Sequence, residues 1–293
     1  MRDQSDEDRN AGGEIPPVAR AGEALAGLLA RPLEPGLYLV ATPIGNLGDI
    51  SLRALSVLAR ADLIAAEDTR HSKKLVSHFG LRTRLTPYHE HNAETERPRL
   101  IARLGAGQSV ALISDAGTPL VSDPGYKLVR EALDRGIKVT SVPGASAVLA
   151  ALTGSGLPTD TFLFAGFLPP KSAARRARLE ELNAVPATLV LFETAPRLAK
   201  CVADMADLLG PREAAICKEL TKLHESVTRG RLDRLAAELA AADAPKGEFV
   251  IVVAPPADRD EPSDAVIEQQ LAKALKLESF RDAVRSVAEV LNV

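Results

Sequence analysis

The feature that most constrains the fold is a regular alternation of short apolar segments with helical patterns, which begins at Leu37. The apolar segments have the length and composition of buried strands, and they cover residues 37–41, 63–66, 110–113 and 138–142. Helical patterns follow Asp49 or Ser51 and then recur at 70–79, 93–104, 125–135 and 145–153. Because parallel strands are joined by helical crossovers, this order predicts an α/β fold with a mainly parallel sheet.

After residues 156–158 the pattern restarts with different proportions. Strand-like segments cover residues 162–167, 187–193, 213–220 and 248–253. Helical patterns lie near 172–183, 196–209 and 231–242. Some connections are short, so we expect a second α/β unit with more antiparallel pairing.

These patterns predict two α/β domains with an extension at each end, as expected from a length of 293 residues. The tail has a helical stripe of apolar residues near its end, and Ser279 with Asp282 resembles a capping box. The predicted parts are a mobile N-terminal extension (1–34), a first domain (35–154), a second domain (155–256), and a linker with a helical tail (257–293).

Composition excludes several classes of protein. A net charge of −3 gives no global attraction to nucleic acid, and 3% aromatic residues without Trp argue against binding of single strands by stacking. Cys201 and Cys217 are isolated and are expected in the core. No apolar run approaches the ~18 residues of a membrane span. The charged first residues do not resemble a secretory leader, so we expect a cytoplasmic protein.

Residues 114–125 form the loop that is most informative about function, because it is rich in glycine, proline and polar residues. Glycine, proline, aspartate and hydroxyl side chains are packed between a predicted strand and a predicted helix. Such a loop exposes backbone N–H and C=O groups to a ligand, because glycine permits close approach and proline removes donors. An ordinary turn is the alternative reading.

Three other predicted strands are followed by segments that are also rich in glycine, proline, hydroxyl or charged residues, at 42–49, 67–71 and 143–146. In open α/β sheets, ligands bind beyond the carboxyl ends of the strands, so these loops should converge on one crevice. The first of them contains Gly45 and Gly48 but neither the G-x-G-x-x-G fingerprint nor a P-loop lysine. Pro43 makes that loop extended and poor in donors, which suits an apolar part of a ligand better than a phosphate.

Residues 67–71 place two carboxylates, a hydroxyl, a guanidinium and an imidazole side by side. In the functional interpretation Glu67 acts as an acid or base or binds a ribose, and Arg70 orients a phosphate. In the structural interpretation Asp68 or Thr69 caps the next helix and Arg70 is solvated. The histidines lack a recognisable ligand pattern, and we predict no metal site.

Two basic segments are candidates for contact with RNA phosphates. Residues 171–178 carry Lys171, Arg175, Arg176 and Arg178, and Lys222 follows a strand of the second domain. The alternative is a solvated helix face for residues 171–178 and an ion-pair cluster for the segment that contains Lys222.

The sequence resembles the ribosomal RNA small-subunit methyltransferase I family, a branch of the tetrapyrrole methylase fold. The resemblance spans residues 36–255 and rests on motifs that occur in the same order, at 40–47, 65–71, 114–125, 156–160, 166–169, 192–193 and 219–222. It implies two α/β domains with S-adenosylmethionine in the cleft between them, and a homodimer. The implied reaction is 2′-O-methylation of a cytidine in the decoding region of 16S ribosomal RNA.

The resemblance also implies which residues bind the cofactor. Gly117-Thr118-Pro119 takes the place of the Gly-Asp-Pro of tetrapyrrole-modifying relatives, so Thr118 replaces an acidic residue. The implied cofactor-binding residues are Pro43, Asp115, Gly117, Thr118, Pro119, Val121, Ser122, Pro143, Ser146, Ala147, Phe192 and Glu193. Members of the family usually continue with a basic, Tyr-containing segment, whereas this sequence stops at Val293, so we assign no RNA role to such a segment.

Methyl transfer from a sulfonium depends mainly on positioning, together with a base for the 2′-hydroxyl proton. Glu67 is our first candidate for this base, and Arg70 would position a phosphate. Two other functions stay open: a methylase of the same fold that acts on a tetrapyrrole or a modified protein side chain, and a ribosome-associated protein without catalysis.

Overall fold

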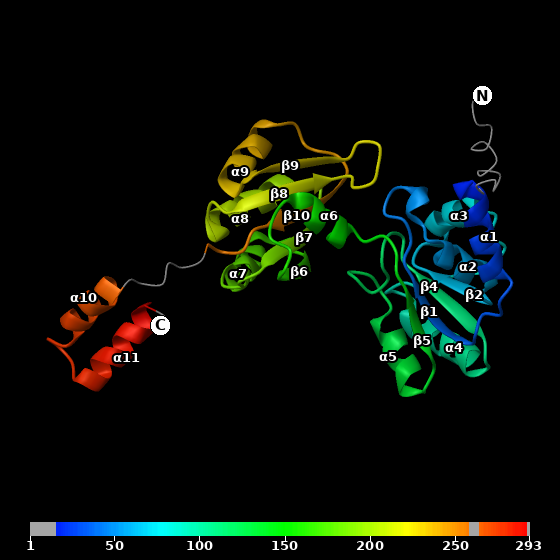
Figure 1. Ribbon diagram of the computed structural model, residues 1–293, viewed down its shortest axis with the longest axis horizontal. Helices are drawn as coiled ribbons and strands as arrows, with labels where there is room; N and C mark the ends of the chain where they lie inside the picture. The colour runs from blue at the N-terminus through cyan, green and yellow to red at the C-terminus, as the bar shows by residue number, and fades with distance from the viewer. Residues whose placement is uncertain (1–15, 258–263, 292–293) are drawn as a thin grey trace, which may run out of the picture. The chain divides into compact units, whose positions relative to one another are not determined.

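A computed structural model describes residues 16–257 and 264–291 (Figure 1). Contacts between Cα atoms divide these residues into two compact units. The first unit contains the chain up to Gly154 together with residues 217–227, and the second contains the remainder. The segment 217–227, which the sequence suggested as part of the second domain, therefore packs with the first unit.

The first unit is built on a five-stranded sheet in the order β3-β2-β4-β1-β5, whose described pairings are all parallel. Its strands are β1 (Gly36–Val40), β2 (Leu63–Ala66), β3 (Leu85–Pro87), β4 (Ser109–Ile113) and β5 (Val139–Val142). Strand β3 was not predicted, because its three residues include a threonine and a proline and show no apolar pattern. The predicted parallel α/β sheet is confirmed.

Helices cover both faces of this sheet because each strand presents alternate side chains to opposite sides. Val40, Ile64 and Ile113 pack with α2 (Leu52–Arg60) and α3 (Thr69–His78). Residues of the alternate set, among them Leu37 and Leu112, pack with α4 (Ala93–Gly105) and α5 (Tyr126–Asp134). The last helix of this unit is α6 (Ala147–Ser155).

Part of the predicted N-terminal extension is a helix. Residues Pro17–Leu29 form α1, which begins with a proline in its first turn and packs against α2. Residues 1–15, where mobility was predicted from charge and glycine content, lie outside the described residues.

The second unit contains a mixed five-stranded sheet in the order β6-β7-β10-β8-β9. Strand β7 runs parallel to β6 and antiparallel to β10. The strands are β6 (Phe162–Phe167), β7 (Thr188–Thr194), β8 (Glu213–Lys218), β9 (Ser226–Arg231) and β10 (Glu248–Val253). Strand β9 was not predicted, because it is polar and largely exposed and so lacks the apolar pattern of a buried strand.

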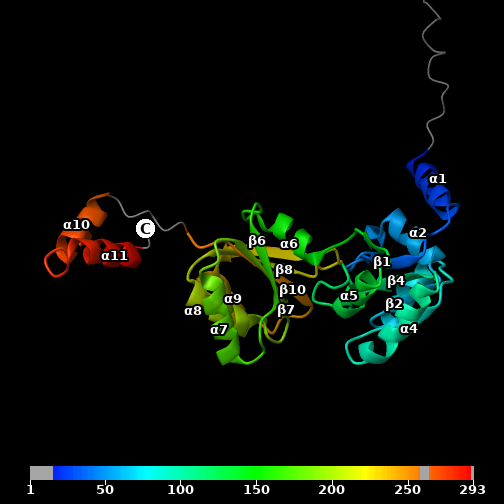
Figure 2. The same cartoon turned by 90° about the horizontal axis from the view of Figure 1, so that it is seen from below.

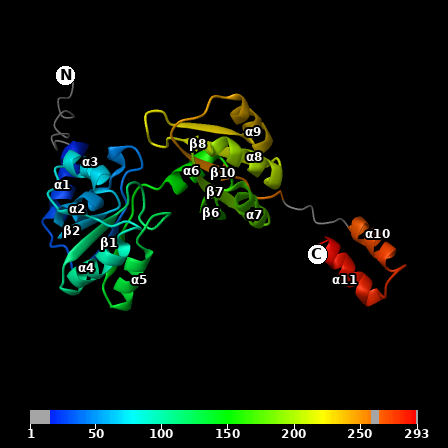
Figure 3. The same cartoon turned by 180° about the vertical axis from the view of Figure 1, so that it is seen from behind.

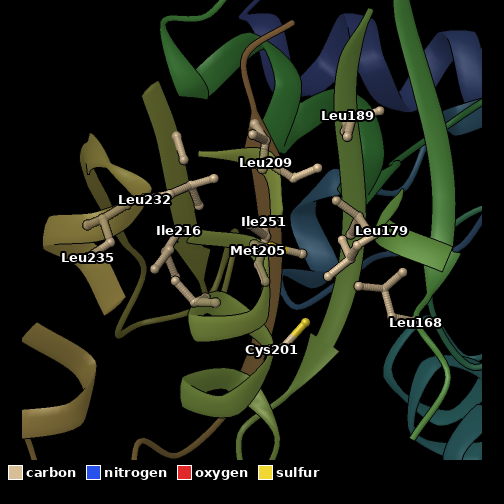
Figure 4. Close-up of a cluster of buried hydrophobic side chains, with 14 of the residues drawn as sticks. Leu168, Leu179, Leu189, Cys201, Met205, Leu209, Ile216, Leu232, Leu235 and Ile251 are labelled. Carbon is tan, nitrogen blue, oxygen red and sulfur yellow. The ribbon is translucent and has the colours of Figure 1, made fainter. Parts of the chain in front are cut away.

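Helices α7 (Ser172–Asn183), α8 (Leu198–Leu209) and α9 (Leu232–Ala241) lie on one side of this second sheet (Figure 2). Their apolar faces and the sheet enclose the core drawn in Figure 4, where Cys201 and Met205 of α8 lie close to Ile251. Cys201 and Cys217 are both buried in the core, as predicted.

The tail forms two helices, α10 (Asp264–Ala274) and α11 (Phe280–Leu291), which lie side by side (Figure 1, Figure 3). The predicted capping box is present at the start of α11, where the Asp282 N–H donates to Ser279 Oγ at 3.3 Å. Helix α10 was not predicted. Among the described helices, none has the length and apolar character needed to cross a bilayer.

Candidate active site

Four strand ends meet at one edge of the first sheet, as the sequence predicted. Thr42, after β1, and Gly117, after β4, form a two-way backbone bridge with N···O distances of 2.9 and 3.0 Å. Thr118 Oγ1 donates to the carbonyl of Ala145, after β5, at 3.4 Å. The Asp68 N–H, after β2, donates to Asp115 Oδ1 at 3.0 Å. Hydrogen bonds therefore tie all four loops together.

The loop after β4 has an unusual backbone. Gly117 and Gly125 have φ values of 78° and 135°, and Leu120 and Ser122 have φ values of 73° and 63°. Non-glycine residues rarely adopt such angles, and where they do the strain is commonly stored at functional sites. A Cβ atom at Gly117 would lie 3.3 Å from Ile44 Cγ2, so this backbone approaches the loop after β1 closely. Ordinary turns often place a glycine at positive φ, but they rarely place two non-glycine residues there within one loop.

A group of carboxylates lies where β2 and β4 end. Glu67 is half-buried, and its pKa is raised by this burial and then by the negative charges of Asp123 and Asp115, while a backbone hydrogen bond from Asp115 opposes the rise. Burial also raises the pKa of Asp123, and a hydrogen bond with Ser114 opposes that rise. Asp123 was not among the predicted site residues, although it lies in the same polar, glycine-rich loop as Asp115.

Arg70 is held by a neighbour in sequence. Its Nη2 atom lies 2.9 Å from Asp68 Oδ2, and 88% of its side chain is exposed. Asp68 also caps α3 by accepting the Arg70 N–H at 2.8 Å, and the hydrogen bonds from Arg70 lower the pKa of Asp68 to about 2. Asp68 is therefore the helix cap and Arg70 is exposed, as the structural interpretation predicted, whereas the functional roles of Glu67 and Arg70 stay predictions.

The remaining predicted residues of the first unit occupy the same strand-end loops but differ in exposure. Pro119 is buried. Ser146 Oγ accepts the Leu149 N–H at 3.4 Å at the start of α6. The half-buried residues are Pro43, Asp115, Thr118, Ser146 and Ala147, and the exposed ones are Val121, Ser122 and Pro143.

The segment 217–227 packs against the loop after β1. A Cβ atom at Gly45 would collide with Lys222 Cγ and lie 3.1 Å from the Leu220 carbonyl oxygen. Lys222 Nζ donates to Glu219 Oε1 at 2.9 Å. Lys222, a predicted RNA contact, is therefore ion-paired beside the strand-end loops, as the alternative interpretation anticipated.

In the second unit, Glu193 near the end of β7 is buried, with a fully covered side chain. Its Oε1 accepts the Thr194 N–H at 2.7 Å, and its Oε2 lies 3.2 Å from Arg197 Nη2. Burial and the nearby charge of Glu193 raise the pKa of the Cys201 thiol. These contacts are all with residues of the same unit, so the Glu193 carboxylate is buried and already paired there.

Phe192 belongs to an aromatic cluster with Phe164 and Phe167, at centroid distances of 4.8 and 5.5 Å. A bulge between Phe164 and Gly166 shifts the register of β6 against β7. Without the bulge, two residues three apart would face opposite sides of the sheet. The extra residue turns Phe167 to the side of Phe164, and half of Phe167 (51%) is exposed.

The arginines of the basic run on α7 form ion pairs with carboxylates; the predicted contact with RNA phosphates is wrong for Arg175 and stays a prediction for the rest of the run. Arg175 is 5% exposed, and its guanidinium lies 2.6 Å from Asp204 Oδ2, so it is not available to RNA. Arg176 pairs with Asp204 at 2.8 Å and with Asp207 at 3.1 Å. Arg178 pairs with Glu181 at 2.6 Å. Lys171 is exposed and has no ion pair with any described residue.

Comparison with known proteins places these features in a family. The family model of the tetrapyrrole (corrin/porphyrin) methylases matches residues 36–236. A protein of Mesorhizobium japonicum called ribosomal RNA small subunit methyltransferase I is 62% identical over 237 residues, which are 80% of this chain and 81% of that relative. A protein of Xylella fastidiosa with the same name is 51% identical over 77% of this chain and 84% of its own length.

Solved structures share the fold at low sequence identity. Diphthine synthase aligns with a TM-score of 0.59 and 21% identity, over 74% of this chain and 89% of its own. Uroporphyrin-III C-methyltransferase from Thermus thermophilus, in complex with S-adenyl homocysteine, aligns with a TM-score of 0.51 and 22% identity. That alignment covers 74% of this chain and 96% of the other.

Proposed function

Because the chain belongs to the tetrapyrrole methylases and, within them, to the ribosomal RNA small subunit methyltransferase I family, we propose that it methylates 16S ribosomal RNA. The methyl donor is S-adenosylmethionine and the acceptor is the 2′-oxygen of a cytidine in the decoding region. The observation that carries this proposal is 62% identity to a protein of that name over 80% of the chain.

The strand-end loops suit this cofactor chemically. S-adenosylmethionine is a cation with ammonium and ribose hydroxyl donors, and the loops offer the carboxylates of Asp115 and Asp123 as acceptors. The bare backbone at Gly117 allows a ligand to approach closely. We assign the binding of the cofactor in this unit to Asp115, Gly117 and Thr118, with Val121, Ser122 and Ser146 around them.

The cofactor supplies an activated methyl group, so the protein must position the acceptor oxygen and accept its proton. Glu67 is the group we assign to the proton, since burial and neighbouring carboxylates raise its pKa above the ordinary value and so make it a stronger base than an exposed carboxylate. Asp68 is a poorer base, because Arg70 holds it as a carboxylate with a pKa of about 2. Glu193 is enclosed in the second unit, which separates its carboxylate from solvent.

Methyl transfer from radiolabelled S-adenosylmethionine tests the proposal. Undermethylated small subunits should accept label at a ribose, recognised by resistance of the adjacent linkage to alkali, and Glu67→Gln should lower turnover with little change in cofactor affinity. Label in a tetrapyrrole precursor or a protein acceptor, and none in the subunit, would replace this function with the same-fold alternative. Cofactor binding without any transfer would favour the non-catalytic one.

Two further expectations accompany the proposal. The chain acts as a homodimer, which light scattering at micromolar concentration can test. Its site of action is the cytoplasm, where small ribosomal subunits are assembled.

A further inference from the structure

Helix α3 begins two residues after Glu67 and contains no acidic residue. Its inner side is fixed by the buried Leu75 and Ser72. Five basic or titratable side chains are exposed on its surface, which we call the α3 basic face: Arg70, His71, Lys73, Lys74 and His78. In a chain with a net charge of −3, this helix reverses the sign of charge locally.

The charges of the α3 basic face are less compensated than those of α7. Arg70 pairs with Asp68, but neither Lys73 nor Lys74 forms an ion pair with any residue in 16–257 or 264–291. On α7, by contrast, Arg175 and Arg176 are engaged by Asp204. A polyanion gains more from the side whose cations are free, because it does not have to displace an internal partner.

The geometry also relates the α3 basic face to the candidate active site. Residues four apart on a helix are separated by about 6 Å along its axis, so Arg70 and Lys74 form a line that leads away from Glu67. Lysine is a point charge on a flexible stem and can follow a phosphate backbone without reading its sequence. The scarcity of aromatic residues leaves electrostatic contact as the available means of holding a strand.

We infer that the α3 basic face binds backbone phosphates of the RNA strand that presents its ribose to Glu67, with Lys73 and Lys74 as the principal contacts. This inference rests on the proposed function and adds to it the surface that receives the substrate. It replaces the α7 run as the main phosphate-binding element. Lys73 and Lys74 are positioning residues, so their removal should raise KM for the subunit more than it lowers kcat.

The test is the double variant Lys73→Gln/Lys74→Gln, with binding to undermethylated small subunits measured by filter retention against salt. Each lost phosphate contact lowers the log–log salt slope by about 0.7 for single strands, so the slope should fall by about 1.4. Between about 50 and 200 mM salt, the parent should therefore lose about 7-fold more affinity than the variant. Calorimetric affinity for S-adenosylhomocysteine should not change.

The control Arg99→Gln/Arg103→Gln removes the same number of charges. These two exposed cations lie four apart on α4, which covers the other face of the same sheet, and Arg99 pairs with Glu96 at 2.6 Å. The control should keep the parental salt slope. An equal fall in both variants would show general electrostatics and overturn the inference, as would a parental slope in Lys73→Gln/Lys74→Gln. If the parent methylates the subunit, either result leaves the proposed function intact. A parent that neither binds nor methylates it overturns both.

Discussion

The conformation of Gly117 allows a sharp test of the loop after β4. Its φ of 78° lies in the left-handed region, and a Cβ atom would lie 3.3 Å from Ile44 Cγ2 and 3.8 Å from the Ala145 carbonyl oxygen. Gly136 has a similar φ of 71°, but a Cβ atom there would have no neighbour within 4 Å. Comparing Gly117→Ala with Gly136→Ala therefore separates backbone strain from the close approach of the loops.

The expected magnitudes follow from these contacts. A left-handed φ costs an L-residue about 1–2 kcal/mol, and the smaller entropy of the unfolded alanine chain returns about 0.4–1 kcal/mol. Gly136→Ala should therefore lose about 1 kcal/mol of unfolding free energy. Gly117→Ala adds a tight contact with Ile44, for which overpacking costs about 1–3 kcal/mol. Its total loss should be about 2–4 kcal/mol, which an ordinary domain survives.

Urea unfolding followed by circular dichroism measures both losses, and titration calorimetry measures affinity for S-adenosylhomocysteine. Gly136→Ala should bind S-adenosylhomocysteine like the parent. Gly117→Ala should lose at least about tenfold in affinity, because a displaced loop that weakens binding by about 1.4 kcal/mol raises Kd tenfold. Parental affinity in a folded Gly117→Ala protein would refute the assignment of this loop to the cofactor. Equal destabilisation of the two variants would refute the argument from the Ile44 contact.

Two further predictions concern charge. Glu67 has a raised pKa in the folded protein, so its contribution to stability is complete below its ordinary value of 4.5 and is lost as pH rises through the folded pKa. Glu67→Gln should therefore unfold like the parent near pH 4 and become more stable than the parent towards pH 8, as measured by urea unfolding at each pH; a constant difference would contradict the burial argument. On α7, Arg175→Ala leaves the largely buried Asp204 without its closest partner and should cost about 3–5 kcal/mol, whereas Arg178→Ala removes an exposed pair and should cost less than about 1 kcal/mol. Equal losses in these two variants would show that the Arg175 pair is not structurally dominant.

The sequence alone determined the alternation of strands and helices and the location of the polar, glycine- and proline-rich loops at the strand ends. Strand and helix patterns depend on residues a few positions apart, and the composition of a loop marks a strand end wherever the strand lies. Because carboxyl ends of parallel strands share one edge, the convergence of Thr42, Asp68, Asp115 and Ala145 was predictable before their hydrogen bonds were known. Strands β3 and β9 escaped prediction because tertiary pairing, and not local pattern, holds short or polar segments in a sheet.

Only the tertiary structure decided which charged side chains are available. The cations on α7 and α3 look alike in the sequence. In the structure Arg175 forms an ion pair with Asp204, which lies 29 residues away on α8, whereas Lys73 forms no ion pair with any described residue. The pKa of Glu67 is likewise raised first by burial and then by the charge of Asp123, a residue on another strand-end loop. Charge interactions act through space and depend on burial, so their partners are set by packing between elements and are not encoded in the local order of residues.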